Sequence, residues 1–132
     1  MTRWKASTLG RWSLRLDAAY CALLGVAVAL GAGLIAEGLV LPPLVITSVG
    51  ITVAIWSVGI AWMLLSRLRL RAVLTFVMTV NLIAALAVTA VSVLAASPLM
   101  VLAVLAVAVD ILLFAASQAT ALRGLTSTQR HG

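Results

Sequence analysis

The sequence predicts an all-α membrane protein in which four transmembrane helices form one bundle. Of the 132 residues, 64% are hydrophobic and only 9% are charged, whereas soluble domains are about half apolar and about a quarter charged. The chain also contains four apolar runs, each close to the roughly 20 residues that a helix needs to cross a bilayer. Finally, the nine Lys and Arg residues lie outside these runs, in three short clusters.

The chain divides into one transmembrane domain and two short flanking segments. Residues 1–16 are basic and contain Trp4 and Trp12, which is typical of a segment at the lipid headgroups, so a juxtamembrane arm is expected there. Residues 17–123 hold the four apolar runs, and residues 124–132 are expected to form a polar tail. The predicted helices cover residues 18–36, 44–65, 72–95 and 99–122.

The borders of the apolar runs carry turn and cap signals. Pro42-Pro43 precedes the second run, and an arginine-rich loop at residues 66–71 ends it. Ser97 is placed as an N-cap and Pro98 as the first residue of the fourth helix. Helices are expected rather than strands, because membrane strands alternate in polarity over about ten residues. Short connections predict two antiparallel hairpins, the second tighter than the first.

The basic residues predict the orientation of the bundle. Four lie in the N-terminal segment, three in the central loop and two near the C-terminus, while one of the other two loops carries Glu37. Cytoplasmic loops of membrane proteins carry an excess of Lys and Arg. We therefore expect both termini in the cytoplasm.

Small residues at four-residue spacing predict where helices approach closely. Gly25, Ala29 and Gly33 recur in this way in the first run, and Gly50 and Ala54 do so in the second. Such ridges allow membrane helices to pack at short distance. Two interpretations remain: packing within the bundle, or contact with a partner protein or a second copy.

Asp110 is the most informative polar residue of the apolar runs. It lies near the middle of the fourth run, where an ionised carboxylate facing lipid costs several kcal/mol. We expect it to face the bundle interior or a wet cavity, in a cluster with Asn81 and Ser57. This cluster is either a structural clasp between helices or a site for protons, a cation or a polar ligand.

A second polar group is expected at the cytoplasmic face. Asp17 stands at the predicted start of the first helix, where a carboxylate complements the helix dipole. The group is either an interfacial network of salt bridges and hydrogen bonds or a pocket for anionic lipid headgroups. Its members are Asp17, Arg15, Tyr20, Gln118, Arg67, Arg69, Arg71 and Arg123.

The sequence contains no pattern typical of an enzyme. No nucleophile elbow, zinc-protease, dithiol or phosphate-loop motif is present, and Cys21 and His131 are the single cysteine and histidine. We therefore expect no catalytic residues, no metal and no cofactor. The basic residues form no continuous face for a nucleic acid.

Several features together resemble a group of small four-helix integral membrane proteins of high-GC Gram-positive bacteria. They are Arg15-Leu16-Asp17-Ala18, Leu41-Pro42, the arginine-rich central loop, Asn81 and Gln118. The plan is also loosely similar to DoxX-like membrane proteins. Members of the group carry no assigned activity, so the resemblance implies a fold and no reaction.

These observations favour a non-enzymatic protein of the bacterial inner membrane, acting as an accessory or stabilising subunit of a larger complex. The expected partners are anionic membrane lipids and other membrane subunits or a second copy. One alternative is a small proton-coupled carrier that uses Asp110 with Asn81. A second alternative is a lipid-binding protein, because of the basic cytoplasmic rim.

Overall fold

The computed structural model describes the backbone of residues 2–131 and the side chains of residues 2–127. This part of the chain contains five α-helices, a short 3-10 turn and no strand. Four helices are long and apolar enough to cross a membrane, so the predicted all-α four-helix fold is confirmed and the chain is a multi-pass membrane protein. The elements are α1 (Arg3–Leu30), α2 (Ala32–Leu39), α3 (Pro43–Leu65), α4 (Leu70–Val91), the turn Ser92–Leu94 and α5 (Pro98–His131).

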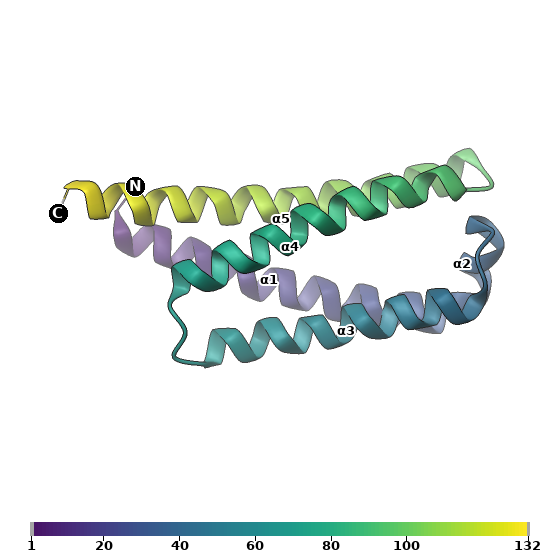
Figure 1. Cartoon of the computed structure of the whole chain (residues 1–132), viewed down its shortest axis with the longest axis horizontal. Coiled ribbons are helices and arrows are strands. Elements are labelled where there is room, and N and C mark those ends of the chain that lie inside the picture. Colours follow the sequence, from purple (N-terminus) through teal and green to yellow (C-terminus); the bar gives the residue numbers. More distant parts are fainter. Residues whose placement is uncertain (1, 132) are drawn as a thin grey trace.

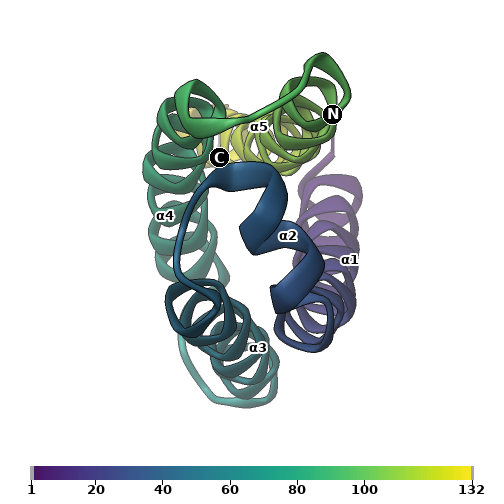
Figure 2. The same ribbon diagram turned by 90° about the vertical axis from the view of Figure 1, so that its right-hand side faces the viewer.

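The four long helices run along one axis, as Figure 1 shows. The start of α1, the end of α5 and the α3–α4 loop lie at one end, which we call the basic end because it carries the arginines. At the opposite end, which we call the α2 end, α2 lies across the mouth of the bundle (Figure 2). The most extensive contacts join α1 to α3 and α4 to α5, and α1 also packs on α5, whereas α3 barely contacts α4. The two predicted antiparallel hairpins are therefore present.

The first helix begins much earlier than expected. Thr2 caps α1 by accepting a hydrogen bond from the backbone N–H of Lys5 at 3.3 Å. The predicted arm, residues 1–16, thus forms the first turns of α1 from Arg3 onward. Ala6, Gly10 and Leu14 recur every four residues and are buried, which explains why this basic segment packs as a helix. Met1 lies outside the described residues.

The last helix also extends further than expected. The predicted tail, residues 124–132, continues α5 as far as His131. Gly124 and Leu125 are buried, and Leu125 belongs to the core of the basic end. The side chains of residues 128–131, and all of Gly132, lie outside the described part.

The predicted single helix over residues 18–36 is interrupted at Gly31. Its N–H still bonds to the carbonyl of Ala27 at 2.9 Å, but α1 ends at Leu30 and α2 turns across the bundle. Ala32, Ala36 and Leu39 are the buried residues of α2. Burying this apolar face favours the change of direction, so α2 closes the end of the bundle instead of extending α1.

The connection between α4 and α5 is short, as predicted. The expected third helix over residues 72–95 ends as an α-helix at Val91 and continues into the 3-10 turn. Ala96 donates its backbone N–H to the carbonyl of Gly38 at 2.7 Å, which ties this loop to α2. The N-cap prediction is confirmed, because Ser97 Oγ accepts from the N–H of Met100 at 3.2 Å.

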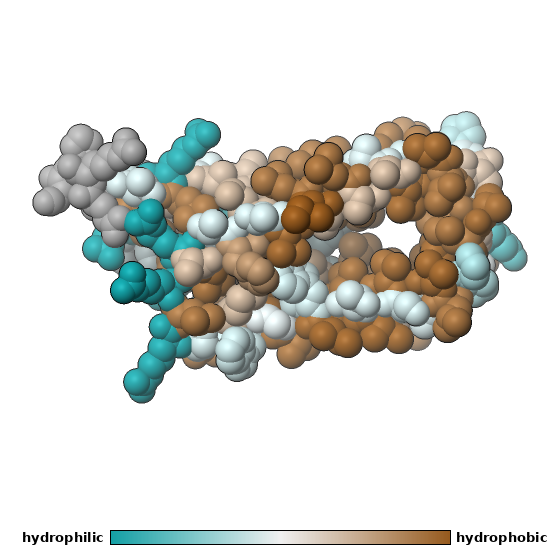
Figure 3. Space-filling model, viewed as in Figure 1, coloured by the Kyte–Doolittle hydropathy of each residue, from teal (hydrophilic) through white to brown (hydrophobic). Residues whose placement is uncertain are grey.

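Two separate groups of apolar side chains form the core. The larger lies at the basic end and includes Leu14, Ile60 and Leu74, and the smaller packs around α2 and includes Leu39 and Ile46. Between them, in the half of the molecule toward α2, Figure 3 shows an opening that separates the α4–α5 hairpin from the α1–α3 hairpin. The bundle is therefore filled at both ends and open in between.

The helices α1 and α3 cross at two glycines. A Cβ added to Gly25 would lie 2.6 Å from the backbone nitrogen of Ala54 and 2.6 Å from the carbonyl oxygen of Gly50. Gly50 in turn faces Ala29, so four members of the predicted ridge pack within the bundle. Gly33 does not belong to this ridge, because the break at Gly31 places it on α2, exposed and with no atom within 4 Å of an added Cβ.

Candidate functional site

One side chain from each of α1, α4 and α5 meets in a buried polar cluster. Asp17, Asn81 and Gln118 are 1%, 4% and 0% exposed. Asn81 Nδ2 donates to Asp17 Oδ2 at 2.6 Å, and Gln118 Nε2 donates to the same oxygen at 2.8 Å. The two amides also bond to each other, because Asn81 Nδ2 lies 3.2 Å from Gln118 Oε1. Together with Cys21, we call these residues the Asp17 cluster.

Cys21 completes the hydrogen bonding of the carboxyl group. It lies one turn after Asp17 on α1 and is buried, and its Sγ donates to Asp17 Oδ1 at 3.4 Å. Both oxygens of Asp17 therefore accept hydrogen bonds, one from two amides and the other from a thiol. Such a group avoids most of the penalty that an unpaired polar atom pays in an apolar interior.

The helical period of the sequence builds this cluster. On α1, Asp17 and Cys21 continue the buried face of Gly10 and Ser13. On α4, Asn81 lies four residues from both Val77 and Ala85, which are buried, and residues three and four apart share a helix face. Each polar residue thus occupies a core position, and the three faces converge.

A second polar contact joins α1 to α5. The hydroxyl of Tyr20 donates to Asp110 Oδ2 at 2.9 Å in a part-buried position, and the ring of Tyr20 lies 5.4 Å from that of Phe114. Nearer the basic end, the hydroxyls of Ser13 and Ser117 share a hydrogen bond. Three polar links therefore tie these helices, namely the Asp17 cluster and these two pairs.

The predicted cluster of Asp110, Asn81 and Ser57 is corrected by these contacts. Asp110 bonds to Tyr20, and Asn81 bonds to the Asp17 cluster. Ser57 donates to the carbonyl of Ala54 in its own helix at 2.6 Å. At about 3.6 residues per turn, Asp110 and Gln118 differ by roughly 80° around α5. Gln118 therefore faces the core beside Asn81, while Asp110 faces Tyr20 of α1 in a part-buried position.

The predicted cytoplasmic-face network is also divided. Because α1 begins at Arg3, Asp17 is far inside the helix rather than at its N-terminus, and its partners are two amides and a thiol instead of arginines. Tyr20 pairs with Asp110. The guanidinium of Arg15 stacks on Trp12 at 5.6 Å. The arginines of the predicted network are all exposed: Arg15, Arg67, Arg69, Arg71 and Arg123.

The chemistry of the cluster is that of a closed hydrogen-bond network. Among the described residues, no buried side-chain nitrogen or oxygen lacks a partner. The same part of the chain contains no group of three His, Cys, Asp or Glu side chains with the geometry of a metal site. Cys21 and the Ser13–Ser117 pair were not predicted, although Ser13 and Cys21 each lie four residues from Asp17 and so share its buried face of α1.

Comparison with known proteins gives no relative from which a function follows. No protein-family model, no curated protein sequence and no solved structure matches the chain.

Proposed function

We propose that the protein is a non-enzymatic accessory or stabilising subunit of a larger complex in the bacterial inner membrane. In this proposal the basic end faces the cytoplasm, as the positive-inside rule expects. The observation that carries the proposal is the Asp17 cluster, in which hydrogen bonds of Asn81 and Gln118 to Asp17 and to each other join α1, α4 and α5. A scaffold requires fixed helix positions, and this network supplies them.

Hydrogen bonds between helices matter for helix pairing in a membrane. Lipid tails are as apolar as leucine, so helix pairing relies on close packing and on hydrogen bonds between helices. The Asp17 cluster supplies the hydrogen bonds, and the Gly25–Gly50 crossing supplies the close packing. Both features support a rigid subunit rather than one that exchanges bound groups.

The lipid-facing surface of α3 supports contact with another transmembrane segment. A shallow groove of about 440 Å³ lies along it, lined by Leu44, Val45, Ser48, Val49, Thr52 and Val53. Ser48 donates to the carbonyl of Leu44 and Thr52 to that of Ser48, each at 2.8 Å. The hydroxyls are therefore satisfied within α3, and Ser48 and Thr52 form a pair of small residues at four-residue spacing that suits close approach of a partner helix.

Photo-crosslinking in the native membrane tests this function. A photoreactive amino acid at Thr52 should yield one crosslinked partner protein in a fixed ratio, and the same partner should co-purify in mild detergent. Thr52→Leu fills the groove and should lower recovery of the partner at least fivefold. Thr120→Leu is the matched control, because Thr120 is also exposed and bonded to its own helix, at Ala116, but lies on α5.

The crosslinking result also has a clear negative outcome. The subunit proposal is contradicted if the photoreactive group at Thr52 yields no crosslinked product and if the chain is recovered as a monomer, without a partner in a fixed ratio, after gentle extraction. Equal loss of the partner in Thr52→Leu and Thr120→Leu would show that α3 is not the surface of contact.

The Tyr20–Asp110 pair favours a second candidate, a small proton-coupled carrier. Asp110 is only part-buried and its one described side-chain partner is the hydroxyl of Tyr20, so this acid, unlike Asp17, is not enclosed by amides. The pair replaces the predicted use of Asp110 with Asn81. The test compares wild type with Asp110→Asn in proteoliposomes that contain a pH-sensitive dye. Equal proton flux in both would rule this candidate out.

A further inference from the structure

A pocket at the basic end is not used by the proposed function. It has a volume of about 1000 Å³ and lies between the first turns of α1, the start of α4 and Leu125 of α5. Four of its lining residues are arginines, and no lining residue is acidic. The arginines are Arg3 and Arg11 from α1, Arg69 at the N-cap of α4, and Arg71 in the first turn of α4.

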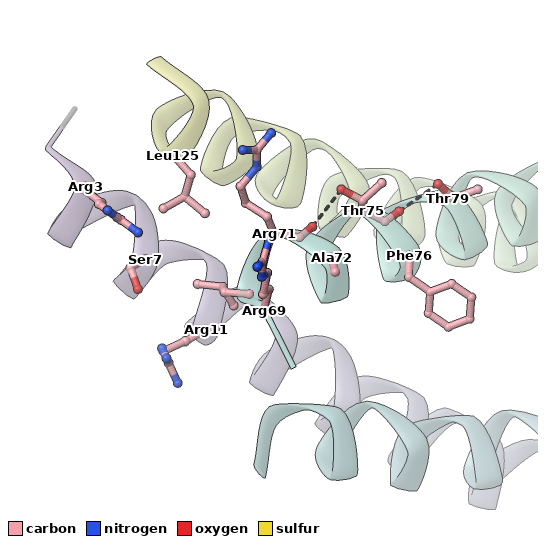
Figure 4. Close-up of a pocket in the computed structure, with 11 residues that line it drawn as sticks. Arg3, Ser7, Arg11, Arg69, Arg71, Ala72, Thr75, Phe76, Thr79 and Leu125 are labelled. Atoms are coloured by element: carbon pink, nitrogen blue, oxygen red, sulfur yellow. Dashed lines mark hydrogen bonds between the residues drawn. The ribbon is translucent and has the colours of Figure 1, made fainter. Parts of the chain in front are cut away.

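Figure 4 shows Arg3 of α1 on one side of the pocket and Arg69 and Arg71 on the other, while the side chain of Arg11 points away from them. Arg3 extends from α1 toward the side on which Arg69 and Arg71 lie, and Leu125 of α5 lies beside Arg3. Segments far apart in the sequence thus bring positive charge to one place. Arginine is the side chain best suited to phosphate, because its planar guanidinium donates two parallel hydrogen bonds.

The start of α4 adds to the positive potential of the pocket. Leu70 and Ala72, which belong to its first turn, line the pocket together with Arg69. The first turn of α4 contains no acidic residue, and Arg69 makes no side-chain cap. The N-terminus of a helix carries a partial positive charge that favours an anion.

The pocket continues from the charged end onto an apolar surface. Phe76 and Leu125 line it, and so do Thr75 and Thr79 on successive turns of α4. The threonine hydroxyls donate to the carbonyls of Arg71 and Thr75, each at 2.8 Å. From Arg69 to Thr79 the lining extends about 15 Å along α4 at roughly 1.5 Å per residue, from the arginines into the apolar part of the bundle.

We propose that this pocket binds the phosphate headgroup of an anionic phospholipid. Arg3, Arg69 and the start of α4 hold the phosphate, while the surface from Phe76 to Thr79 takes the first part of an acyl chain. A free phosphate ion satisfies only the charged half of the pocket, so an amphiphile is the ligand that fits both halves. This site goes beyond a role as a subunit and does not depend on it.

Thermal unfolding and native mass spectrometry of the full chain in detergent test the site. Phosphatidylglycerol should raise the melting temperature and remain bound, while phosphatidylcholine and inorganic phosphate at equal concentration should have little effect. Arg3→Gln with Arg69→Gln should weaken phosphatidylglycerol binding at least tenfold. Arg15→Gln with Arg123→Gln is the matched control, because both are exposed arginines that do not line the pocket.

The comparison separates the possible outcomes. Loss of binding in the pocket variant alone supports the proposal, and Arg3→Lys with Arg69→Lys should retain only part of the wild-type binding. Equal loss in both variants indicates diffuse surface charge and overturns the site. Equal stabilisation by inorganic phosphate assigns the pocket to a soluble anion and overturns the lipid assignment. Unchanged melting of the ligand-free variants shows that they fold, since the exchanged side chains are exposed.

Discussion

Asp17 and Gln118 are separated by 101 positions in the chain and meet at 2.8 Å in the core of the bundle. Both side chains are buried, at 1% and 0% exposed, although both are near arginines in the sequence. Their hydrogen bond joins the first helix to the last, and Asn81 brings in α4. The position of these two residues decides how the hairpins fit together.

Removing the amide of Gln118 should destabilise the bundle. Gln118→Met keeps most of the volume but leaves Asp17 with one amide donor fewer. We expect a loss of about 1–3 kcal/mol in the free energy of unfolding, the cost of a buried polar group that loses its partner. Unfolding in mixed micelles with increasing SDS measures it. Thr120→Val, at an exposed site of the same helix, should change the free energy little.

A double-mutant cycle identifies the cluster as one unit. The losses for Asp17→Ala and Gln118→Met should be clearly less than additive in the double variant, because the first substitution already removes the acceptor. Additive losses would contradict a shared network.

The glycine crossing of α1 and α3 should not tolerate a methyl group. In Gly25→Ala the new Cβ would meet backbone atoms of α3 at 2.6 Å, so the helices must separate. Overpacking of this kind costs about 1–3 kcal/mol. Gly59→Ala is the control, because nothing lies within 4 Å of an added Cβ there and alanine is the better helix former. The two variants should shift the melting temperature in opposite directions, and equal shifts would disprove the close crossing.

The Tyr20–Asp110 hydrogen bond should be measurable as a coupling. Tyr20→Phe removes only the hydroxyl, so its cost in wild type should exceed its cost in an Asp110→Ala background. Hydrogen bonds between membrane helices average about 0.6 kcal/mol and reach about 1.7 kcal/mol, and we expect the coupling in this range. The ring contact with Phe114 is retained in both backgrounds. Identical costs would show that the pair contributes nothing.

The orientation of the bundle can be read from thiol labelling. Cys21 is buried and is the single cysteine, so a membrane-impermeant maleimide should not react with the wild-type protein. Ala96→Cys, an exposed position in the α4–α5 loop, should react in intact cells. Arg67→Cys, exposed at the basic end, should react only after the membrane is opened. The reverse pattern would place the basic end outside.

The lengths of the apolar runs were enough to predict four spans and two hairpins. The glycine crossing was also predictable, because Gly25 and Gly50 each begin a pair of small residues at four-residue spacing. The break at Gly31 was not, because no polar or proline residue marks it within the apolar run. Its cause is tertiary: Ala32, Ala36 and Leu39 bury their face across the end of the bundle.

The polar residues were recognised individually but assigned to the wrong groups. The basic residues of the first 16 positions suggested a surface arm, although they occupy the exposed face of a helix whose other face, with Ala6 and Leu14, is buried. Because the first helix was predicted to start near position 17, Asp17 was assigned to the membrane surface. Asn81 was then assigned as the partner of Asp110. The sequence thus indicated the depth of each polar residue along its helix but not the direction in which its side chain points around the helix axis. That direction determines which side chains meet.

The opening between the two hairpins in the half toward α2 has a consequence for how the protein must be handled (Figure 3). Side chains leave that space open in the view of Figure 3, and we expect acyl chains of neighbouring lipids to occupy it in a bilayer. In that case lipid contributes to the packing of the interior as well as surrounding the bundle. Small detergent micelles supply few acyl chains to this opening. We therefore expect α2 to detach from the end of the bundle first when the protein is extracted.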